Sequence, residues 1–477
     1  MDVLWGLGGM VGLLAIAVAL STNRRAIRLR TVGGALAIQL GVGLLVLYWD
    51  EGARALEWAA KGVNAVIGAS GEGIGFLFGG LLEGQGTVFA FQVLPVVIFV
   101  ASLVAVLFYL GIMQKIVHVI GGGLRVLLGT SHTESLNAAA NVFVGQTEAP
   151  LFIRPYLART TRSELFAIMV GGLATVAGTV LVGYSLLGAR LDYLIAASFM
   201  AAPGGLLMAK ILIPETEEPA VVTGARAETE GDGGEPPERA EGTVAEGGAR
   251  PGIKAGTGGA GGTGETSGTG ETSGTGETGG ASAGTAAATA AAAATKPSGG
   301  EPEAERPRNV IDAAARGAAD GLRLALNIGA MLLAFISLIA LLNLLLGAVG
   351  GWFGAPDLSF EQLIGYVFAP VMTMIGVPWS EAVDAGSFVG QKLVLNEFVA
   401  FADFAPQIDQ FSDKTAVVTT FALTGFANFS SLAILLGGLG SLIPQRRGEI
   451  AQLGLRAVLA GTLANLMSAT IAGMFVG

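Results

Sequence analysis

Long apolar segments recur along the whole chain, and they constrain its fold more than any other feature. Each is close to the ~20 residues that a helix needs to cross the hydrocarbon core of a bilayer. The segments lie near residues 3–20, 33–49, 88–112, 163–187, 191–213, 323–349, 412–438 and 450–476. Only 13% of the residues are charged, about half the fraction that is typical of soluble domains. The sequence therefore predicts an all-α polytopic membrane protein with about eight transmembrane helices.

Basic residues predict the orientation of these helices. The first apolar segment is followed by four arginines, Arg24, Arg25, Arg28 and Arg30. We expect the protein to lie in the plasma membrane. Because Lys and Arg in short loops remain on the cytoplasmic side, the N-terminus is expected outside the cell. Arg446 and Arg447, between the last two segments, then fall inside as well.

Two moderately apolar segments, 133–158 and 380–404, are too polar to cross lipid as ordinary helices. The first contains Glu148 and the second contains Glu397. Each is long enough to enter the membrane and return, and counting either one as a span would reverse the side of every later loop. We therefore predict two re-entrant hairpins that enter from opposite sides. Each precedes an interrupted helix, which is the arrangement of an inverted repeat with its substrate site near the midplane.

The segment 214–308 differs from the rest of the chain because it is acidic and rich in Gly, Glu, Thr, Ala and Pro. Between Glu215 and Glu305, sixteen acidic and five basic residues give a net charge of −11. This composition cannot bury enough apolar surface to fold, so we predict a disordered cytoplasmic insert. A short amphipathic interfacial helix is expected next, at 309–322, with an apolar side that carries Val310, Ala313, Ala314, Ala318 and Leu322. The predicted domains are N-terminal scaffold helices (1–114), a first repeat half (115–213), the insert (214–308) and a second repeat half (309–477).

Three short polar segments carry side chains suited to binding a solute. In the first hairpin, Gly145 and Pro150 break the helix and free backbone groups around an amide, a hydroxyl and a carboxylate. The second hairpin places a carboxylate in an apolar run, which costs about 2.5–3.5 kcal/mol on insertion scales and indicates a functional role. The third segment, 424–440, adds an amide, hydroxyls and phenylalanine rings. Together they suit a polar, uncharged, ring-containing solute with several hydroxyl groups.

These segments resemble a known family. GQTEAPLFIRPYL (145–157), KLVLNEFVA (392–400) and GFANFSSLAILLGGLG (425–440) are similar to signature segments of the concentrative nucleoside transporters. The resemblance covers essentially the whole membrane part and omits the insert. It implies a trimer, a nucleoside substrate, a scaffold and a moving transport domain in each protomer, and sodium as the coupling ion. Some members of the family couple to protons instead.

The resemblance also implies roles for individual residues. Those expected at the nucleobase are Gln146, Thr147 and Glu148, with Val180 beside it. Those expected at the ribose hydroxyls are Glu397, Asn428 and Ser431, with Phe426 lining the pocket. The implied sodium ligands are the side chains of Asn141 and Thr175 and the carbonyl oxygens of Val144 and Val176. The family often has serine where this chain has Thr175, and threonine keeps the hydroxyl.

Two other classes of function compete with a symporter. An intramembrane enzyme would use Glu148 and Glu397 as an acid–base pair, but the chain has no cysteine and no HExxH motif. A passive channel also uses re-entrant segments, but buried carboxylates in an occluded site favour a carrier. We therefore expect a transporter and not an enzyme, with no organic cofactor and no nucleic-acid partner. The preference between purine and pyrimidine nucleosides stays open.

Overall fold

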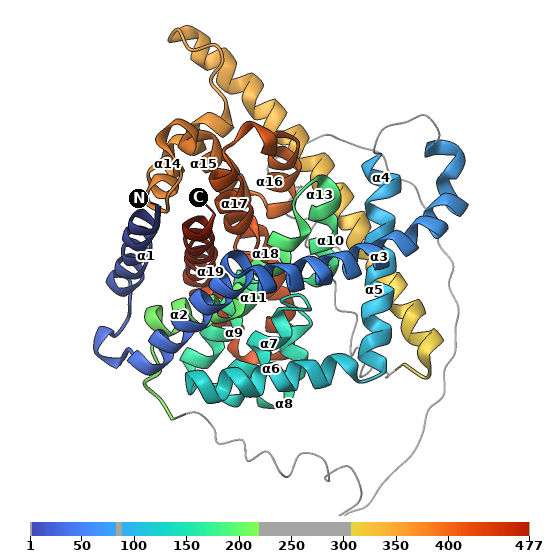
Figure 1. The fold of residues 1–477 in the computed structure, drawn as a ribbon, viewed down its shortest axis with the longest axis vertical. Coiled ribbons are helices and arrows are strands. Elements are labelled where there is room, and N and C mark those ends of the chain that lie inside the picture. The colour runs from blue at the N-terminus through green and yellow to red at the C-terminus, as the bar shows by residue number, and fades with distance from the viewer. Residues whose placement is uncertain (1, 83–87, 219–306, 477) are drawn as a thin grey trace, which may run out of the picture. The chain divides into compact units, whose positions relative to one another are not determined.

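The computed structural model describes residues 2–82, 88–218 and 307–476, and these residues form helices and contain no β-strand (Figure 1). The predicted all-α class is therefore confirmed. The N-terminal elements are α1 (Asp2–Ala19), α2 (Leu29–Gly43), α3 (Asp50–Leu82), α4 (Phe89–Gln92) and α5 (Leu94–Tyr109). In Figure 1, α3 and α6 (Ile112–Leu128) run crosswise to α1 and α5.

From α6 onward, the same order of elements occurs twice. The first set is α6, α7 (His132–Asn141), α8 (Arg154–Leu157), α9 (Arg162–Ala174), α10 (Gly178–Leu187) and α11 (Leu191–Leu212). The second set is α14 (Phe360–Met374), α15 (Trp379–Val394), α16 (Glu397–Phe404), α17 (Asp413–Leu423), α18 (Phe429–Leu442) and α19 (Arg447–Phe475). In each set a helix leads into a hairpin, then a broken helix, then a long helix. The predicted interruptions are confirmed between α9 and α10 and between α17 and α18.

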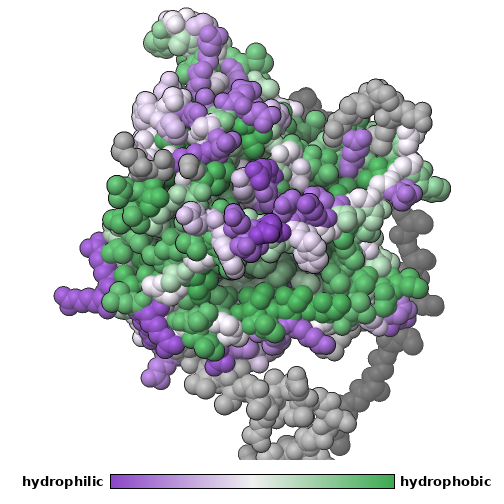
Figure 2. All heavy atoms as spheres, in the orientation of Figure 1, coloured by the Kyte–Doolittle hydropathy of each residue, from purple (hydrophilic) through white to green (hydrophobic). Residues whose placement is uncertain are grey.

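Among the described residues, six helices are long and apolar enough to cross a membrane, and α14 and α15 form a further pair bent by 117°. The predicted spans at α1 and α18 are apolar but shorter helices. Large hydrophobic side chains are exposed, such as Leu333 (74%) and Leu344 (72%). Figure 2 shows broad hydrophobic areas on the face in view. Exposed apolar surface on this scale is expected of a chain that is surrounded by lipid.

The structure corrects the prediction of a separate interfacial helix at 309–322. A single helix, α13, extends from Val310 to Trp352 (43 residues), so the amphipathic segment and the following span are continuous. Of the residues expected on its apolar side, Ala313 is buried, but Val310 and Leu322 are both more than 40% exposed. The buried face carries small residues, Ala313 together with Gly317 and Gly321.

These small residues let α13 pack closely against α5. A Cβ at Gly317 would lie 2.8 Å from the Ala101 carbonyl oxygen, and a Cβ at Gly321 would lie 2.7 Å from Ile98 Cα. Ser102 Oγ also donates a hydrogen bond to the Ala314 carbonyl oxygen (2.8 Å). Close backbone approach at small residues is a common way for membrane helices to associate. Burial of this segment against α5 therefore explains why it continues the helix and does not lie on the surface.

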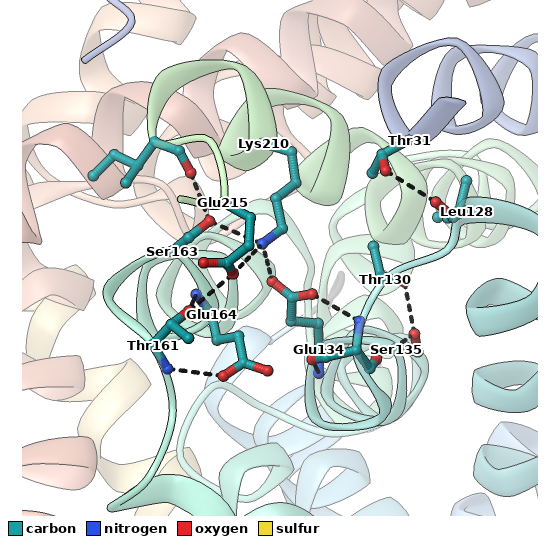
Figure 3. Close-up of polar contacts among 12 residues, drawn as sticks. Thr31, Leu128, Thr130, Glu134, Ser135, Thr161, Ser163, Glu164, Lys210 and Glu215 are labelled. Atoms are coloured by element: carbon teal, nitrogen blue, oxygen red, sulfur yellow. Dashed lines mark hydrogen bonds and ion pairs between the residues drawn. The ribbon is translucent and has the colours of Figure 1, made fainter. Parts of the chain in front are cut away.

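A buried polar cluster, the Lys210 cluster, holds the start of the first hairpin (Figure 3). Lys210, in the last turn of α11, forms ion pairs with Glu134 and Glu215 and donates a hydrogen bond to Ser163 Oγ (2.8 Å). Glu134 lies in the capping box that begins α7, and Ser163 lies in the first turn of α9. Thr161 Oγ1 donates to Glu215 (2.9 Å). One lysine thus joins the N-termini of α7 and α9 to the C-terminus of α11.

The second hairpin has a related anchor. Glu381 is the third residue of α15, as Glu134 is the third residue of α7. Its carboxylate accepts hydrogen bonds from the Ser412 hydroxyl (2.8 Å) and the Ser412 N–H (3.3 Å), and Ser412 caps α17. Each hairpin is therefore connected at its base to the broken helix that follows it. The predicted insert falls outside the described residues, except for 214–218 and 307–308 at its ends.

Candidate functional site

A buried carboxylate, that of Glu397, lies where the second hairpin meets both broken helices. Glu397 is the first residue of α16, and Asn396 caps that end by accepting a hydrogen bond from the Val399 N–H (2.9 Å). Glu397 is only 5% exposed. Tyr184 Oη donates to its Oε1 (3.0 Å), and Asn428 Nδ2 donates to its Oε2 (2.6 Å). Each carboxylate oxygen keeps another lone pair, so the group can accept hydrogen bonds from a hydroxylated solute.

Asn428 connects this carboxylate to the break between α17 and α18. It caps α18, and its Oδ1 accepts hydrogen bonds from the Ser431 N–H (2.6 Å) and from Ser430 Oγ (2.8 Å). Ser431 is buried in the first turn of α18, and Phe426 is half-buried within the break. The structure therefore brings Glu397, Asn428 and Ser431 together, and Phe426 lies two residues before Asn428.

The turn of the first hairpin lies between α9 and α18. A Cβ at Gly172 on α9 would be 2.7 Å from Gln146 Cβ, and a Cβ at Gly438 on α18 would be 2.8 Å from Thr147 Cγ2. Gln146 is buried, and its Oε1 has no hydrogen-bond partner among the described residues. Glu148, by contrast, is exposed. Gln146 and Thr147 thus fit tightly against both broken helices, with an amide oxygen still available for a ligand.

Tyr184 is a site residue that the sequence analysis missed. It is fully buried on α10, four residues after the buried Val180, and its hydroxyl holds Glu397. Its ring stacks on Phe401 (4.4 Å between centroids) and meets Phe398 edge-on (4.9 Å). No local pattern distinguishes Tyr184 from a packing aromatic residue in an apolar helix. Only the folded contact, between residues far apart in sequence, identifies it.

The predicted sodium ligands lie at the ends of α7 and α9. Asn141 is the last residue of α7 and is fully buried. Its Nδ2 donates to the Asn137 carbonyl oxygen (2.9 Å), whereas its Oδ1 has no partner among the described residues. Thr175 is the C-cap of α9, and its hydroxyl donates to the Gly171 carbonyl oxygen (2.8 Å), leaving oxygen lone pairs.

The two helix ends that carry these side chains are in contact. A Cβ at Gly171 would lie 3.5 Å from Asn141 Nδ2, and the Gly178 N–H donates to the Phe143 carbonyl oxygen (3.1 Å). The other predicted ligands are carbonyl groups in the non-helical segments that follow α7 and α9, Val144 and Val176. Oxygen ligands from an unwound backbone are typical of the coupling-ion sites of transporters.

Fold and site together define a polytopic all-α membrane protein in which a buried carboxylate on the second hairpin is held by residues of both broken helices. Three family models match the chain. They are the Na+ dependent nucleoside transporter N-terminus (residues 8–81), the gate model described as nucleoside recognition (90–190) and the Na+ dependent nucleoside transporter C-terminus (281–473).

Individual relatives match over the full length. The chain is 48% identical to the uncharacterized transporter YutK of Bacillus subtilis, over 100% of both chains. It is 41% identical to the nucleoside permease NupC of Helicobacter pylori, over 99% of this chain and 98% of NupC. Among solved structures, CNTnw in an inward-facing substrate-bound state has a TM-score of 0.80 at 45% identity, covering 100% of this chain and 98% of CNTnw. The chain belongs to the concentrative, Na+-dependent nucleoside transporter family.

Proposed function

We propose that this protein carries nucleosides into the cell by sodium-coupled symport, with one central site that opens alternately to the two sides of the membrane. The Glu397 carboxylate carries the proposal, because it is buried, held by two neutral donors, and able to accept further hydrogen bonds. Ribose hydroxyls are suitable donors, and the Gln146 amide suits the edge of a nucleobase. Relatives that are named permeases and transporters, and not enzymes, support the same class.

The proposed contacts divide into two groups. The nucleobase lies against Gln146, Thr147, Glu148 and Val180. The ribose lies against Glu397, Asn428, Ser431 and Phe426. These groups come from different halves of the chain, so the substrate joins the first hairpin to the second. Rearrangement of the hairpins around the bound nucleoside is then a means of closing one side before the other opens.

The residues at the ends of α7 and α9 fit a sodium ion. They offer oxygen ligands, and the buried Asn141 Oδ1 lacks a partner among the described residues. The ligands would be Asn141, Thr175 and the carbonyl oxygens of Val144 and Val176, and the bound ion would supply a positive charge among them. Its ligands then hold the first hairpin turn, which carries Gln146, in its substrate-binding form. This is how ion and nucleoside raise each other's affinity.

A substitution at Thr175 tests this ion site. Thr175→Val keeps the shape of the side chain and removes the hydroxyl. We expect the sodium concentration for half-maximal uptake to rise about 10-fold, equivalent to about 1.4 kcal/mol for one lost ligand, with little change at saturating sodium. Thr470→Val is the matched control, because Thr470 is also buried and also donates to the carbonyl oxygen four residues earlier (2.7 Å). An unchanged sodium dependence in Thr175→Val would show that its hydroxyl is not a ligand.

Uptake into proteoliposomes tests the function itself. We expect labelled uridine or adenosine to accumulate above its external concentration when an inward sodium gradient is applied at fixed pH. Accumulation driven by a proton gradient alone would replace sodium with a proton as the coupling ion. Equilibration without accumulation would indicate a channel, and no uptake by folded protein would contradict a nucleoside substrate.

We also propose a homotrimer in the plasma membrane, with the N-terminus outside and the insert 214–308 in the cytoplasm. The arginines after α1 support this orientation, and the exposed apolar side chains of α13 are available to lipid or to a neighbouring protomer. The proposed domains remain the scaffold helices 1–114 and the repeat halves 115–213 and 309–477.

A further inference from the structure

One asparagine side chain completes the ends of both broken helices. Asn465 lies within α19 and is 1% exposed. Its Nδ2 donates one hydrogen bond to the Ala174 carbonyl oxygen (2.7 Å) and another to the Thr424 carbonyl oxygen (2.9 Å). Ala174 is the last residue of α9, and Thr424 is the C-cap of α17. Carbonyl groups at a helix end lack helical partners, so Asn465 supplies partners to both breaks at once.

Lys392 determines how this asparagine is oriented. Lys392 lies in the last turn of α15 and is 2% exposed. Its Nζ donates to Asn465 Oδ1 (2.9 Å) and to the Ala422 carbonyl oxygen (2.7 Å). An ammonium group only donates, so Asn465 must present its oxygen to Lys392 and its nitrogen to the two carbonyl groups. The ammonium charge also lies at the C-terminal end of α17, where the helix dipole favours a cation.

The two breaks that Asn465 joins are also in direct contact with each other. The Phe426 N–H donates a hydrogen bond to the Thr175 carbonyl oxygen (3.1 Å). Gly425, the residue before Phe426, has a φ of 157°. Its position beside Asn465 leaves no room for a side chain. A Cβ there would overlap Asn465 Oδ1 and would lie 2.7 Å from the Ala174 carbonyl oxygen. The break that carries a proposed sodium ligand and the break that carries proposed nucleoside ligands are therefore parts of one hydrogen-bonded unit.

We propose that Lys392 and Asn465 form a brace that couples the sodium site to the nucleoside site. The inference rests on the proposed function, since it presupposes both sites. The brace holds the break that contains Thr175 and the break that contains Asn428 through their backbone carbonyl groups. A ligand that orders one break then lowers the entropy cost of ordering the other. Lys392 and Asn465 are thus positioning residues that act through the backbone.

Equilibrium binding to the purified full-length protein tests the brace. The measured quantity is the ratio of nucleoside Kd values in choline chloride and in sodium chloride, with uridine or adenosine, whichever the wild type transports. In the wild type we expect sodium to raise affinity by about 5- to 150-fold, the usual range of coupling between sites. In Asn465→Asp we expect the ratio to fall below about 3-fold. The aspartate keeps the shape and an acceptor for Lys392 but places an oxygen against two carbonyl oxygens.

Asn343→Asp is the matched control. Asn343 on α13 also donates from its amide nitrogen, to both carboxylate oxygens of Glu361 (3.1 and 2.9 Å), and its oxygen accepts from the Phe360 N–H (2.8 Å). Both of these partners lie on α14 and not in either break. This variant loses the same kind of bonds, so we expect lower stability with an unchanged ratio of Kd values. If Asn465 had only a structural role, Asn465→Asp would also lower the stability and leave the ratio of Kd values unchanged.

Two further measurements keep the brace testable if Asn465→Asp does not fold. Lys392→Gln removes the charge that orients Asn465, and its ratio of Kd values should fall in the same direction. In the wild type, sodium without nucleoside should slow hydrogen exchange of the Phe426 amide, which bonds to Thr175. A wild-type ratio in either folded variant, or no sodium effect on that amide, overturns the brace. If nucleoside uptake by the wild type did not depend on sodium, the proposed coupling ion would be refuted instead.

Discussion

Replacing Glu397 with glutamine is expected to lower kcat/KM for nucleoside uptake by at least about 100-fold. The variant loses two charge-assisted hydrogen bonds to ribose hydroxyls, each worth about 1.5–3 kcal/mol, and about 1.4 kcal/mol corresponds to a tenfold change. Glutamine also turns an NH2 group toward Tyr184 or Asn428, both of which now donate to the carboxylate. Initial uptake rates into proteoliposomes, at saturating sodium and varied nucleoside, provide the measurement.

Asp403→Asn is the matched control for this substitution. Asp403 lies on the same helix, α16, and its carboxylate also accepts hydrogen bonds from neutral donors, Gln391 Nε2 (2.7 Å) and Gln407 Nε2 (3.0 Å). It makes no contact with Tyr184 or Asn428 in the described part of the chain. We expect its kcat/KM to stay close to the wild-type value. Equal effects of the two substitutions would mean that Glu397 stabilises the second hairpin without contacting the substrate.

Lys210→Met is expected to destabilise the protein by about 3–5 kcal/mol, the usual cost of removing one partner from a buried ion pair. Lys210 and its partners Glu134 and Glu215 are all less than 10% exposed, so the substitution leaves two buried carboxylates without their cation (Figure 3). Reversible unfolding of the purified protein, followed by circular dichroism, measures the change in free energy of unfolding.

An exposed lysine in the same chain provides the comparison. Lys61 pairs with Glu57 on α3 at 2.8 Å, but the two side chains are 72% and 61% exposed. Lys61→Met should therefore cost less than about 1 kcal/mol. Adding Glu134→Gln and Glu215→Gln to Lys210→Met should recover part of the lost stability, because the unpaired carboxylates are then neutral. Equal destabilisation by the two lysine substitutions would contradict a stabilising role for the Lys210 cluster.

Local patterns were sufficient to predict the positions of the helix breaks. Gly145 and Pro150 interrupt the first hairpin, and the polar residues around Asn428 interrupt an apolar run, so each break is visible in a short stretch of sequence. The same local patterns, read with the family resemblance, predicted that Asn141 and Thr175 belong to one site, and the structure places their helix ends in contact. Their roles as ligands remain proposals.

Features that depend on distant packing could not be predicted in this way. Tyr184 and Asn465 belong to no recognisable local motif, and their partners lie 213 and 291 residues away. The helices α3 and α14 were not expected because α3 is interrupted by charged residues and α14 is short, with only 15 residues. The apolar side at 309–322 was predicted only in part, because glycine scores as neutral in an apolar pattern, yet Gly317 and Gly321 lie directly against α5.

The hydrogen bond from Asn465 to the Ala174 carbonyl oxygen cannot form until the chain has been synthesised as far as α19. The two residues are 291 positions apart, and ribosomes add about 5–20 residues per second. The end of α9 must therefore wait on the order of 15 to 60 seconds, within the membrane, before its partner is synthesised. The ion site consequently matures only after translation is nearly complete, and a nascent chain truncated before α19 should be inserted but unable to respond to sodium.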